Sequence, residues 1–420
     1  MSIIKENIAS GIELYVNKLN KFKTVTINVY ISNKLSDETA KFALLPSVLR
    51  RGSFSFKTYK DITKHLEDLY GATFAYSVYK KGERQIAQFK MEIVDSTYLK
   101  EDILEESVKF ISDILLNPLI SNDGFEQTYV QQEKEKQKNI INSRVNEKTK
   151  YAVERCIEEM CKDEDYSIYE LGNVDDVDKI DEKNLYEYYK KAIKRLPIDI
   201  FVVGNVDVDN VKELFNNYFK VERTNVDVIP DTPILRKINK VKYVEDKLDV
   251  TQGKLTLGYR TNVNPWDEEY FSLLVLSSVL GGGPFSKLFM NVRERESLAY
   301  YAQTRLERFK GLMLIMSGIE IENYEKALEI IQKQVEEIKS GNISDYEIDS
   351  AVKALITSFN SIKDSGTQLA DFYLSQKLSH TNYSIDDFIN KVKKVTINDI
   401  VDVSKKLQLD TVYFMTKNEE

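Results

Sequence analysis

Apolar and polar residues alternate along several segments in the first half of the chain. Thr24–Ser32 and Ile86–Val94 both alternate in this way, which is typical of antiparallel strands with one buried face. Elsewhere apolar residues recur every three or four positions, and this spacing predicts helices at Asp37–Leu49, Tyr59–Leu69 and Asp102–Leu116. The last of these helices should end before Pro118, because proline cannot continue a helix.

A long polar segment, Gly124–Lys162, has a helical pattern. Ile198–Phe219 is then expected to form a strand, a glycine-containing turn and a helix. The pattern changes at residues 221–247, which contain two prolines, many charges and little helical period. That composition is typical of a linker between domains.

The same kinds of element are predicted in the second half. The pattern predicts strands at Lys254–Thr261, Tyr300–Glu307, Leu312–Ile321 and Thr411–Thr416, and helices at Trp266–Leu280, Phe285–Glu296, Tyr324–Lys339 and Asp345–Leu378. Strands and helices mixed in this order indicate an α+β fold class with mainly antiparallel sheets, not a regular βαβ series.

The chain also contains an internal repeat. SVLRRGSFS (Ser47–Ser55) resembles SVLGGGPFS (Ser278–Ser286), and LYGATFAYSVYKKG (Leu69–Gly82) aligns with LAYYAQTRLERFKG (Leu298–Gly311). This spacing is too long for a solenoid repeat, so it indicates one domain duplicated in tandem. We therefore expect an N-terminal domain at residues 1–220, a linker at 221–247 and a homologous C-terminal domain at 248–420.

Composition excludes some classes of function. The net charge of −8 argues against a general nucleic-acid binder, whose surface would be basic. No apolar run is long enough for a signal peptide or a membrane span, so we expect no membrane association. Cys156 and Cys161 form no CxxC pattern, and as unpaired thiols they fit a reducing cytoplasm.

Both halves of the repeat resemble the two homologous halves of a subunit of the pitrilysin, insulinase and mitochondrial-processing-peptidase family. This family contains zinc metallopeptidases and inactive relatives. The resemblance covers nearly the whole chain and is strongest at Gly281–Gly311. It implies two tandem α+β domains that form half of a hollow chamber, which is completed by a second subunit.

Active members of the family carry His-x-x-Glu-His on a helix in the first half, where two imidazoles bind zinc and the glutamate is the general base. Anchoring the match on Gly52 places these three positions at Ala43, Pro46 and Ser47. Alanine and proline offer no ligand or base, and serine is a poor zinc ligand. The degenerate motif therefore predicts that this chain holds no catalytic zinc, so a single-chain zinc hydrolase is excluded.

Other residues do not replace the missing ligands. The chain has two histidines, His65 and His380, with no second histidine near either. His65 is expected on a helix surface, although the acids that follow it could make a weak metal contact. Glu133 or Glu135 falls where the distal glutamate ligand of the family would lie, but it has no histidines to join.

The second half keeps a different part of the family's site. Arg293 and Tyr300 match the family's arginine–tyrosine pair. By resemblance, Tyr300 donates a hydrogen bond to the scissile carbonyl oxygen and Arg293 holds the substrate backbone or orients Tyr300. If the helix continued, the seven-residue spacing would place both on one face, but Tyr300 could also lie at the helix exit. The alternative is that Arg293 pairs with Glu296 or a nearby acid while Tyr300 packs in the core.

The glycine triplet Gly281–Gly283 could suggest a phosphate loop. However, no Lys-Ser/Thr pair follows it and no buried strand leads into it. A stop and restart between two helices is the better interpretation.

Two functions remain open from the sequence. The first is a zinc-less subunit of a heterodimeric cytoplasmic peptidase, which supplies Arg293 and Tyr300 in trans to a zinc-bearing homologous partner. Its peptide substrate would add as a strand to an exposed sheet edge. The second is a non-catalytic peptide-binding or assembly protein, which forms a homodimer in isolation.

Overall fold

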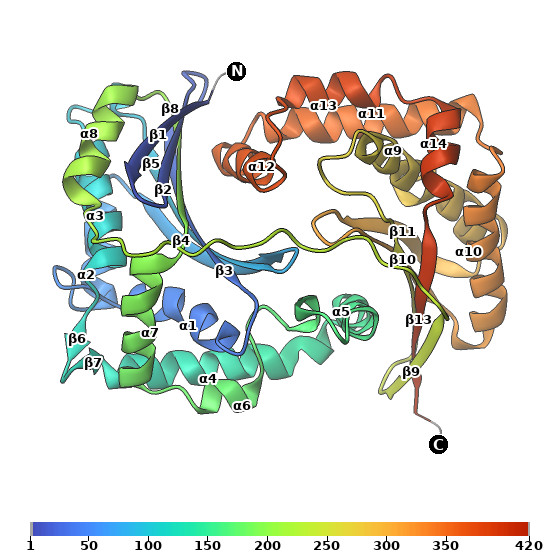
Figure 1. Cartoon of the computed structure of the whole chain (residues 1–420), viewed down its shortest axis with the longest axis horizontal. Coiled ribbons are helices and arrows are strands. Elements are labelled where there is room, and N and C mark those ends of the chain that lie inside the picture. Colours follow the sequence, from blue (N-terminus) through green and yellow to red (C-terminus); the bar gives the residue numbers. More distant parts are fainter. Residues whose placement is uncertain (1–2, 419–420) are drawn as a thin grey trace. The chain divides into compact units, whose positions relative to one another are not determined.

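The computed structural model describes residues 3–418 and divides them into two compact units (Figure 1). Unit 1 contains residues 3–142, 168–231 and 365–375, and unit 2 contains residues 143–167, 232–364 and 376–418. Each unit has its own sheet and its own helices. The α+β fold class predicted from the sequence is confirmed.

Unit 1 is built on a six-stranded sheet in the order β1-β2-β8-β3-β5-β4. Neighbouring strands run antiparallel except β2 and β8, which are parallel. The strands are β1 (Ile4–Ala9), β2 (Ile12–Lys18), β3 (Thr24–Lys34), β4 (Thr73–Lys81), β5 (Arg84–Val94) and β8 (Ile198–Gly204), with a separate pair β6 (Ile120–Ser121) and β7 (Gly124–Phe125). The helices are α1 (Thr39–Leu49), α2 (Tyr59–Asp68), α3 (Leu104–Leu116), α4 (Gln127–Ser143), α6 (Val174–Asp178), α7 (Glu182–Arg195) and α8 (Val208–Tyr218).

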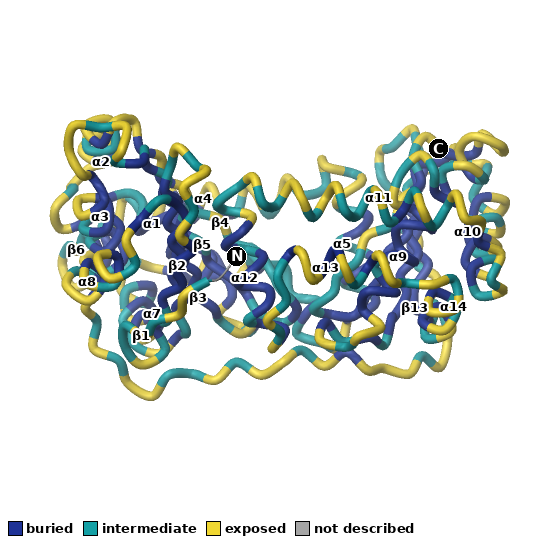
Figure 2. The backbone as a smooth tube through the Cα atoms, turned by 90° about the horizontal axis from the view of Figure 1, so that it is seen from above, coloured by how far each residue is buried: buried dark blue, intermediate teal, exposed yellow. Residues whose placement is uncertain are grey.

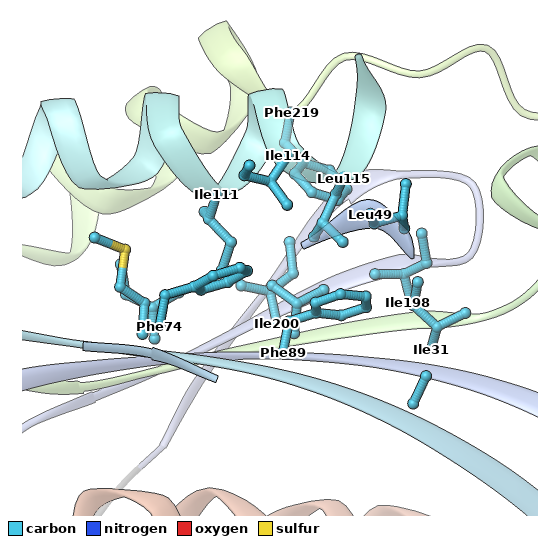
Figure 3. Close-up of a cluster of buried hydrophobic side chains, with 14 of the residues drawn as sticks. Ile31, Leu49, Phe74, Phe89, Ile111, Ile114, Leu115, Ile198, Ile200 and Phe219 are labelled. Carbon is cyan, nitrogen blue, oxygen red and sulfur yellow. The ribbon is translucent and has the colours of Figure 1, made fainter. Parts of the chain in front are cut away.

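The core of unit 1 lies between its sheet and helices α1 and α3. Phe74 and Phe89 project from neighbouring strands toward Ile111 and Leu115 of α3 (Figure 3). All four side chains are buried, and burying one large apolar side chain contributes about 1.5–3 kcal/mol. Leu45, Val48 and Leu49 of α1 are buried in the same cluster, so α1 also packs against the sheet.

Unit 2 is built on a five-stranded sheet in the order β11-β12-β10-β13-β9. The strands are β9 (Lys242–Leu248), β10 (Gly253–Arg260), β11 (Ala299–Glu307), β12 (Leu312–Ile319) and β13 (Gln408–Lys417). The helices are α5 (Lys148–Met160), α9 (Glu269–Gly281), the π-helix η4 (Phe289–Arg295), α10 (Tyr324–Lys339), α11 (Asp345–Ile362), α13 (Ile385–Val392) and α14 (Ile397–Ser404). Most of β13 and α9 is buried (Figure 2).

The two sheets share one topology. Strands β2, β3, β4, β5 and β8 of unit 1 have the same chain order and the same neighbours as β9, β10, β11, β12 and β13 of unit 2. In each sheet the only parallel pair is the corresponding one, β2 with β8 and β9 with β13. This correspondence agrees with the tandem duplication indicated by the internal repeat.

Among the described residues, each unit includes one α-helix from the other half of the sequence. Helix α5 packs on the sheet of unit 2, where the Sγ atom of Cys156 lies 3.9 Å from the carbonyl oxygen of Thr256. Most of α12 (Gly366–Leu378) belongs to unit 1, where Asp371 accepts hydrogen bonds from Tyr79 at 3.1 Å and from Lys81 at 2.9 Å. The exchanged segments cross the domain boundaries expected from the sequence.

Both exchanged helices follow a break in a segment that was predicted to be one helix. Gly124–Lys162 forms α4 and α5, separated by a short 3₁₀ turn at Arg144–Asn146. Asp345–Leu378 forms α11 and α12, separated at residues 363–365. The expected linker is also shorter than 221–247, because β9 begins at Lys242 and pairs with β13.

A buried ionic cluster joins the 143–167 segment to the sheet of unit 2. Glu164 accepts hydrogen bonds from Arg260 at 2.8 and 3.4 Å, and its Oε2 atom lies 2.6 Å from the Nζ atom of Lys310. Arg260 also donates to Asp410 at 2.9 Å and to the carbonyl oxygen of Met160 at 2.6 Å. The Arg260 and Lys310 side chains are 1% and 0% exposed. Both buried cations are therefore stabilised by the carboxylates they contact rather than by water.

Candidate functional site

Helix α1 carries the three positions that the sequence match aligns with the zinc motif. Ala43, Pro46 and Ser47 are all buried. Ser47 Oγ donates to the carbonyl oxygen of Leu44 at 2.8 Å, so its hydroxyl is already used within the helix. These side chains do not fit a zinc ion, and no cluster of three His, Cys, Asp or Glu residues occurs among residues 3–418.

Of the two candidates for the distal glutamate, only Glu133 lies beside α1. Helix α4 packs along α1, since Gln137 donates to the carbonyl oxygen of Ala40 at 3.2 Å. The Glu133 side chain is 7% exposed, whereas that of Glu135 is 52% exposed and pairs with Lys138. Of the two candidates, Glu133 alone places a buried carboxylate beside α1.

A guanidinium group now neutralises this carboxylate. Arg51 follows the end of α1, and its Nη1 lies 3.4 Å from Oε1 of Glu133. Its plane also lies over the ring of Tyr129, 4.8 Å from the centroid, and its Nη2 donates to Gln132. Since the Oε2 atom of Glu133 has no hydrogen bond and only Lys136 at 3.7 Å, Arg51 supplies most of its compensation.

The two histidines lie outside any metal site. His65 was expected on the helix surface, but it is half-buried between Phe56 and Phe110, with ring centroids 4.7 and 5.3 Å away. Burial lowers the pKa of His65 below its ordinary value, so it is a neutral packing residue at pH 7. His380 contacts the edge of Trp266.

Arg293 lies on the π-helix η4, a rare element that often occurs at functional sites. Its guanidinium lies over the Phe289 ring, 4.7 Å from the centroid, and its side chain is 45% exposed. Its ion-pair partner is Glu294, not Glu296, at a distance of 3.7 Å. Such an exposed contact contributes little, about 0–1 kcal/mol, so the Arg293 charge remains available for another partner.

Tyr300 lies on β11, which is an edge strand of the sheet in unit 2. The pairing of β11 with β12 shifts between Ala299 and Tyr301, so Tyr300 lies at a β-bulge. The side chain is 58% exposed, and its hydroxyl donates to Glu320. This hydrogen bond raises the pKa of Tyr300 above its ordinary value, so the phenol stays protonated as a donor at pH 7.

The helix that carries Arg293 ends before Tyr300. Ser297 adopts a left-handed conformation with φ of 54°, and the amide of Leu298 bonds to the carbonyl of Val292 at 3.0 Å. Arg293 therefore lies on a helix and Tyr300 on the following strand. Arg293 contacts Phe289 and Glu294, whereas Tyr300 contacts Glu320. Tyr300 does not pack in the core, which contradicts that part of the alternative left open by the sequence.

The glycine triplet has a packing role. A Cβ atom on Gly281 would lie 2.6 Å from the backbone nitrogen of Thr304, and one on Gly282 would lie 2.6 Å from Ser278 Oγ. Only glycine allows β11 to approach the end of α9 this closely.

Sequence reasoning missed Arg51 and Glu320. Each is an ordinary charged residue, and its importance comes from a partner 82 or 20 positions away in the chain. One signal was available for Arg51. A glutamate retained without the zinc ligands around it would be a buried charge, and a buried carboxylate requires a nearby cation.

The fold and this incomplete site define a peptidase-like protein without the zinc motif, and the comparisons with known proteins agree on the peptidase-like class. Residues 179–355 match the family model for the Peptidase M16 inactive domain. The chain is 37% identical over 412 residues to the "Probable inactive metalloprotease YmfF" of Bacillus subtilis, covering 97% of this chain and 96% of that protein. It is 20% identical over 412 residues to the "Uncharacterized zinc protease YmxG" of the same organism, covering 95% and 94%.

Among solved structures, a conserved protein from Enterococcus faecalis matches with a TM-score of 0.91 and 30% identity, covering 100% of this chain and 99% of that one. The chain therefore belongs to the M16 peptidase family, and it lacks the zinc motif of the family's active members. The family expected from the sequence is confirmed. Across residues 3–418, no helix is both long and apolar enough to span a membrane.

Proposed function

We propose that this chain is the zinc-less subunit of a cytoplasmic heterodimeric peptidase and that it supplies Arg293 and Tyr300 to the site of a zinc-bearing M16 partner. The observation that carries the proposal is the state of Tyr300. Its hydroxyl is exposed on an edge strand at a β-bulge, and it is protonated and bonded to one surface carboxylate. A protonated phenol exposed at a sheet edge can donate a hydrogen bond to a peptide that binds there.

The chemistry of the pair suits an oxyanion. Tyr300 donates a hydrogen bond to the peptide carbonyl oxygen as negative charge develops on it, and Glu320 holds the hydroxyl in place until substrate binds. Arg293 adds a fixed charge with several donors, whose weak contact with Glu294 is easily exchanged for a substrate carbonyl. A donor of this kind contributes about 10²–10³-fold to the rate.

The edge strands offer a way to bind peptides of varied sequence. Strands β4 and β11 each form an edge of their sheet and leave backbone groups available for pairing. A peptide that adds as a further strand gains main-chain hydrogen bonds that do not depend on its side chains. We propose this mode of substrate binding for the assembled peptidase.

A cytoplasmic location suits the thiols. Cys156 and Cys161 are free and buried, and burial raises the pKa of Cys161 to about 11. Neither thiol is therefore reactive at neutral pH, and the chain does not depend on a disulfide for its stability.

The decisive experiment mixes this chain with its zinc-bearing homologue from the same source and follows a quenched fluorescent peptide. The expected result is cleavage that neither chain shows alone. Tyr300→Phe should lower kcat by about 10²–10³-fold with little change in KM. Tyr243→Phe is the matched control, since Tyr243 is 63% exposed on β9 and has no role in the proposal. If Tyr300→Phe were as active as the control variant, the role of its hydroxyl would be refuted.

A second candidate function is a non-catalytic peptide-binding or assembly protein. It is favoured by the replacement of the zinc ligands and by the Arg51–Glu133 pair, which commits the remaining ligand to a structural contact. This alternative predicts a homodimer that binds peptides and ignores the zinc-bearing homologue. Co-purification from the native source separates the two functions, because only the first yields a one-to-one complex that contains zinc.

A further inference from the structure

Unit 2 contains a pocket that the proposed peptidase site does not use. It has a volume of about 540 Å³ and lies between η4, α10 and the beginning of α11. The residues that line it include three cations and two carboxylates, so the pocket has an excess of one positive charge in a chain whose net charge is −8. These charged residues are Lys287, Arg295, Lys333, Glu337 and Glu347.

One wall of the pocket is preorganised by buried polar contacts. Lys287 is 6% exposed, and its Nζ lies 3.0 Å from Oε1 of Glu347. Glu347 also accepts from the backbone and hydroxyl of Ser344, which caps α11. Nearby, Asn291 donates to the buried side chain of Gln334 at 2.7 Å. The charge of Glu347 is therefore compensated within the protein.

Two cations at the pocket form no ion pair within 4.0 Å among residues 3–418, although the Lys333 charge helps to lower the pKa of Glu296 after the Lys326 contact. Arg295 donates to the side-chain oxygen of Asn291 at 2.9 Å and forms no ion pair within 4.0 Å among the described residues. Lys333 forms no hydrogen bond or ion pair within the same part of the chain. The remaining carboxylate, Glu337, accepts a hydrogen bond from Asn342. The positive excess of the pocket is thus located on Arg295 and Lys333.

This pocket is separate from the Arg293 surface. Side chains four positions apart lie on the same side of a helix, and the contacts along η4 form two such sets that are offset by two positions. Arg295 contacts Asn291, which in turn bonds to the carbonyl oxygen of Lys287 at 2.9 Å. Arg293 instead stacks on Phe289. The two sets of side chains form different faces of η4, so a ligand in the pocket would not occupy Arg293.

We propose that this pocket binds a carboxylate carried by a peptide, either a C-terminal α-carboxylate or an acidic side chain. A monoanion balances the single excess charge, whereas a phosphate dianion would exceed it. The guanidinium of Arg295 presents paired donors that match a carboxylate, and Lys333 adds a mobile charge. Met290 and Tyr346, 39% and 70% exposed, supply apolar surface for the aliphatic part of the ligand.

The proposal requires no partner chain and is tested on the isolated full-length protein. Fluorescence anisotropy is measured with three labelled peptides of otherwise equal sequence. The first has a free C-terminus and no acidic residue, the second has an amidated C-terminus and one glutamate, and the third is amidated and has no acid. The first or the second peptide should bind, and the third should not. Stronger binding of the first would indicate an α-carboxylate ligand, and stronger binding of the second an acidic side chain.

Variants then locate the binding. Arg295→Gln and Lys333→Met should each weaken binding of the preferred peptide by roughly five- to tenfold, and added salt should weaken it further. Lys339→Met is the matched control on α10, since Lys339 pairs with Glu336 and neither residue lines the pocket. Equal affinity in the wild type and both pocket variants would overturn the proposal, as would equal binding of all three peptides. Displacement of the peptide by inorganic phosphate but not by acetate at equal ionic strength would overturn the choice of a carboxylate.

Discussion

Glu164→Gln should strongly destabilise unit 2. The carboxylate of Glu164 pairs with Arg260 and Lys310, whose side chains are almost completely buried, and also with Arg236. Glutamine has a similar shape but no charge. After the change Arg260 would keep Asp410, whereas Lys310 would lose its 2.6 Å contact with the Glu164 carboxylate.

The expected loss is about 3–5 kcal/mol in the free energy of unfolding, because breaking a buried ion pair leaves an uncompensated charge. At an m-value of about 2 kcal/mol/M this shifts the urea midpoint by roughly 2 M. The chain has one tryptophan, Trp266, and it lies in unit 2. Its fluorescence therefore reports the unfolding of this unit apart from unit 1.

Two further variants test the electrostatic explanation. Adding Lys310→Met to Glu164→Gln removes the buried cation that lost its Glu164 contact and should recover part of the lost stability. Glu269→Gln removes one side of the exposed pair with Lys406 in the same unit and should cost less than about 1 kcal/mol. The reasoning would be refuted if Glu164→Gln cost no more than Glu269→Gln.

The same cluster predicts a pH dependence. Burial alone would raise the pKa of Glu164, but hydrogen bonds from Arg260 and Lys310 outweigh it and hold the pKa below its ordinary value. The folded state therefore binds the proton less readily than the unfolded state. The stability that this carboxylate contributes is present above an unfolded pKa of about 4.3 and is lost as the pH falls through the lower folded pKa. The stability gap between the wild type and Glu164→Gln should narrow below that pH.

Three other predictions concern the candidate site. The hydrogen bond to Glu320 raises the pKa of Tyr300, so the reconstituted peptidase should lose no activity through ionisation of this phenol until the pH exceeds about 10. An activity loss at lower pH in the wild type that is absent in Tyr300→Phe would contradict this. Arg51→Ala should leave the buried carboxylate of Glu133 poorly compensated and lower the free energy of unfolding by about 1–3 kcal/mol. Amide hydrogen exchange in α1 and α4 should then be faster, and unchanged exchange would argue against the pair. Gly281→Ala should cost about 1–3 kcal/mol in urea unfolding because its Cβ meets backbone, whereas Gly283→Ala meets a movable ring and should cost less.

Much of the fold could be predicted from local pattern. The strands β3, β5 and β10 and the helices α1, α3 and α10 lie close to the segments that alternation and helical spacing indicated. These signals are local because a side chain's neighbours on a strand or a helix face are fixed by short sequence separations. The breaks between α4 and α5 and between α11 and α12 were missed, because continuous helical propensity does not reveal where tertiary contacts redirect the chain.

The candidate site was predictable only in part. The absence of a zinc ligand set followed from the chain having just two histidines. The exposure of Tyr300 depended on a left-handed Ser297 and a β-bulge, neither of which has a clear signature in LAYYAQTRL. The partners of Glu133 and Tyr300 depended on how segments distant in the chain pack.

By itself the sequence determined the α+β class, the duplicated pattern and the loss of the zinc motif, since each depends on residue types and short spacings. Only the tertiary structure decided that α5 joins the sheet of unit 2 and most of α12 that of unit 1, and that Arg51 compensates Glu133. The apolar stripe of a helix shows that it must be buried but not against which sheet. That choice depends on the shape and charge of surfaces assembled from distant parts of the chain.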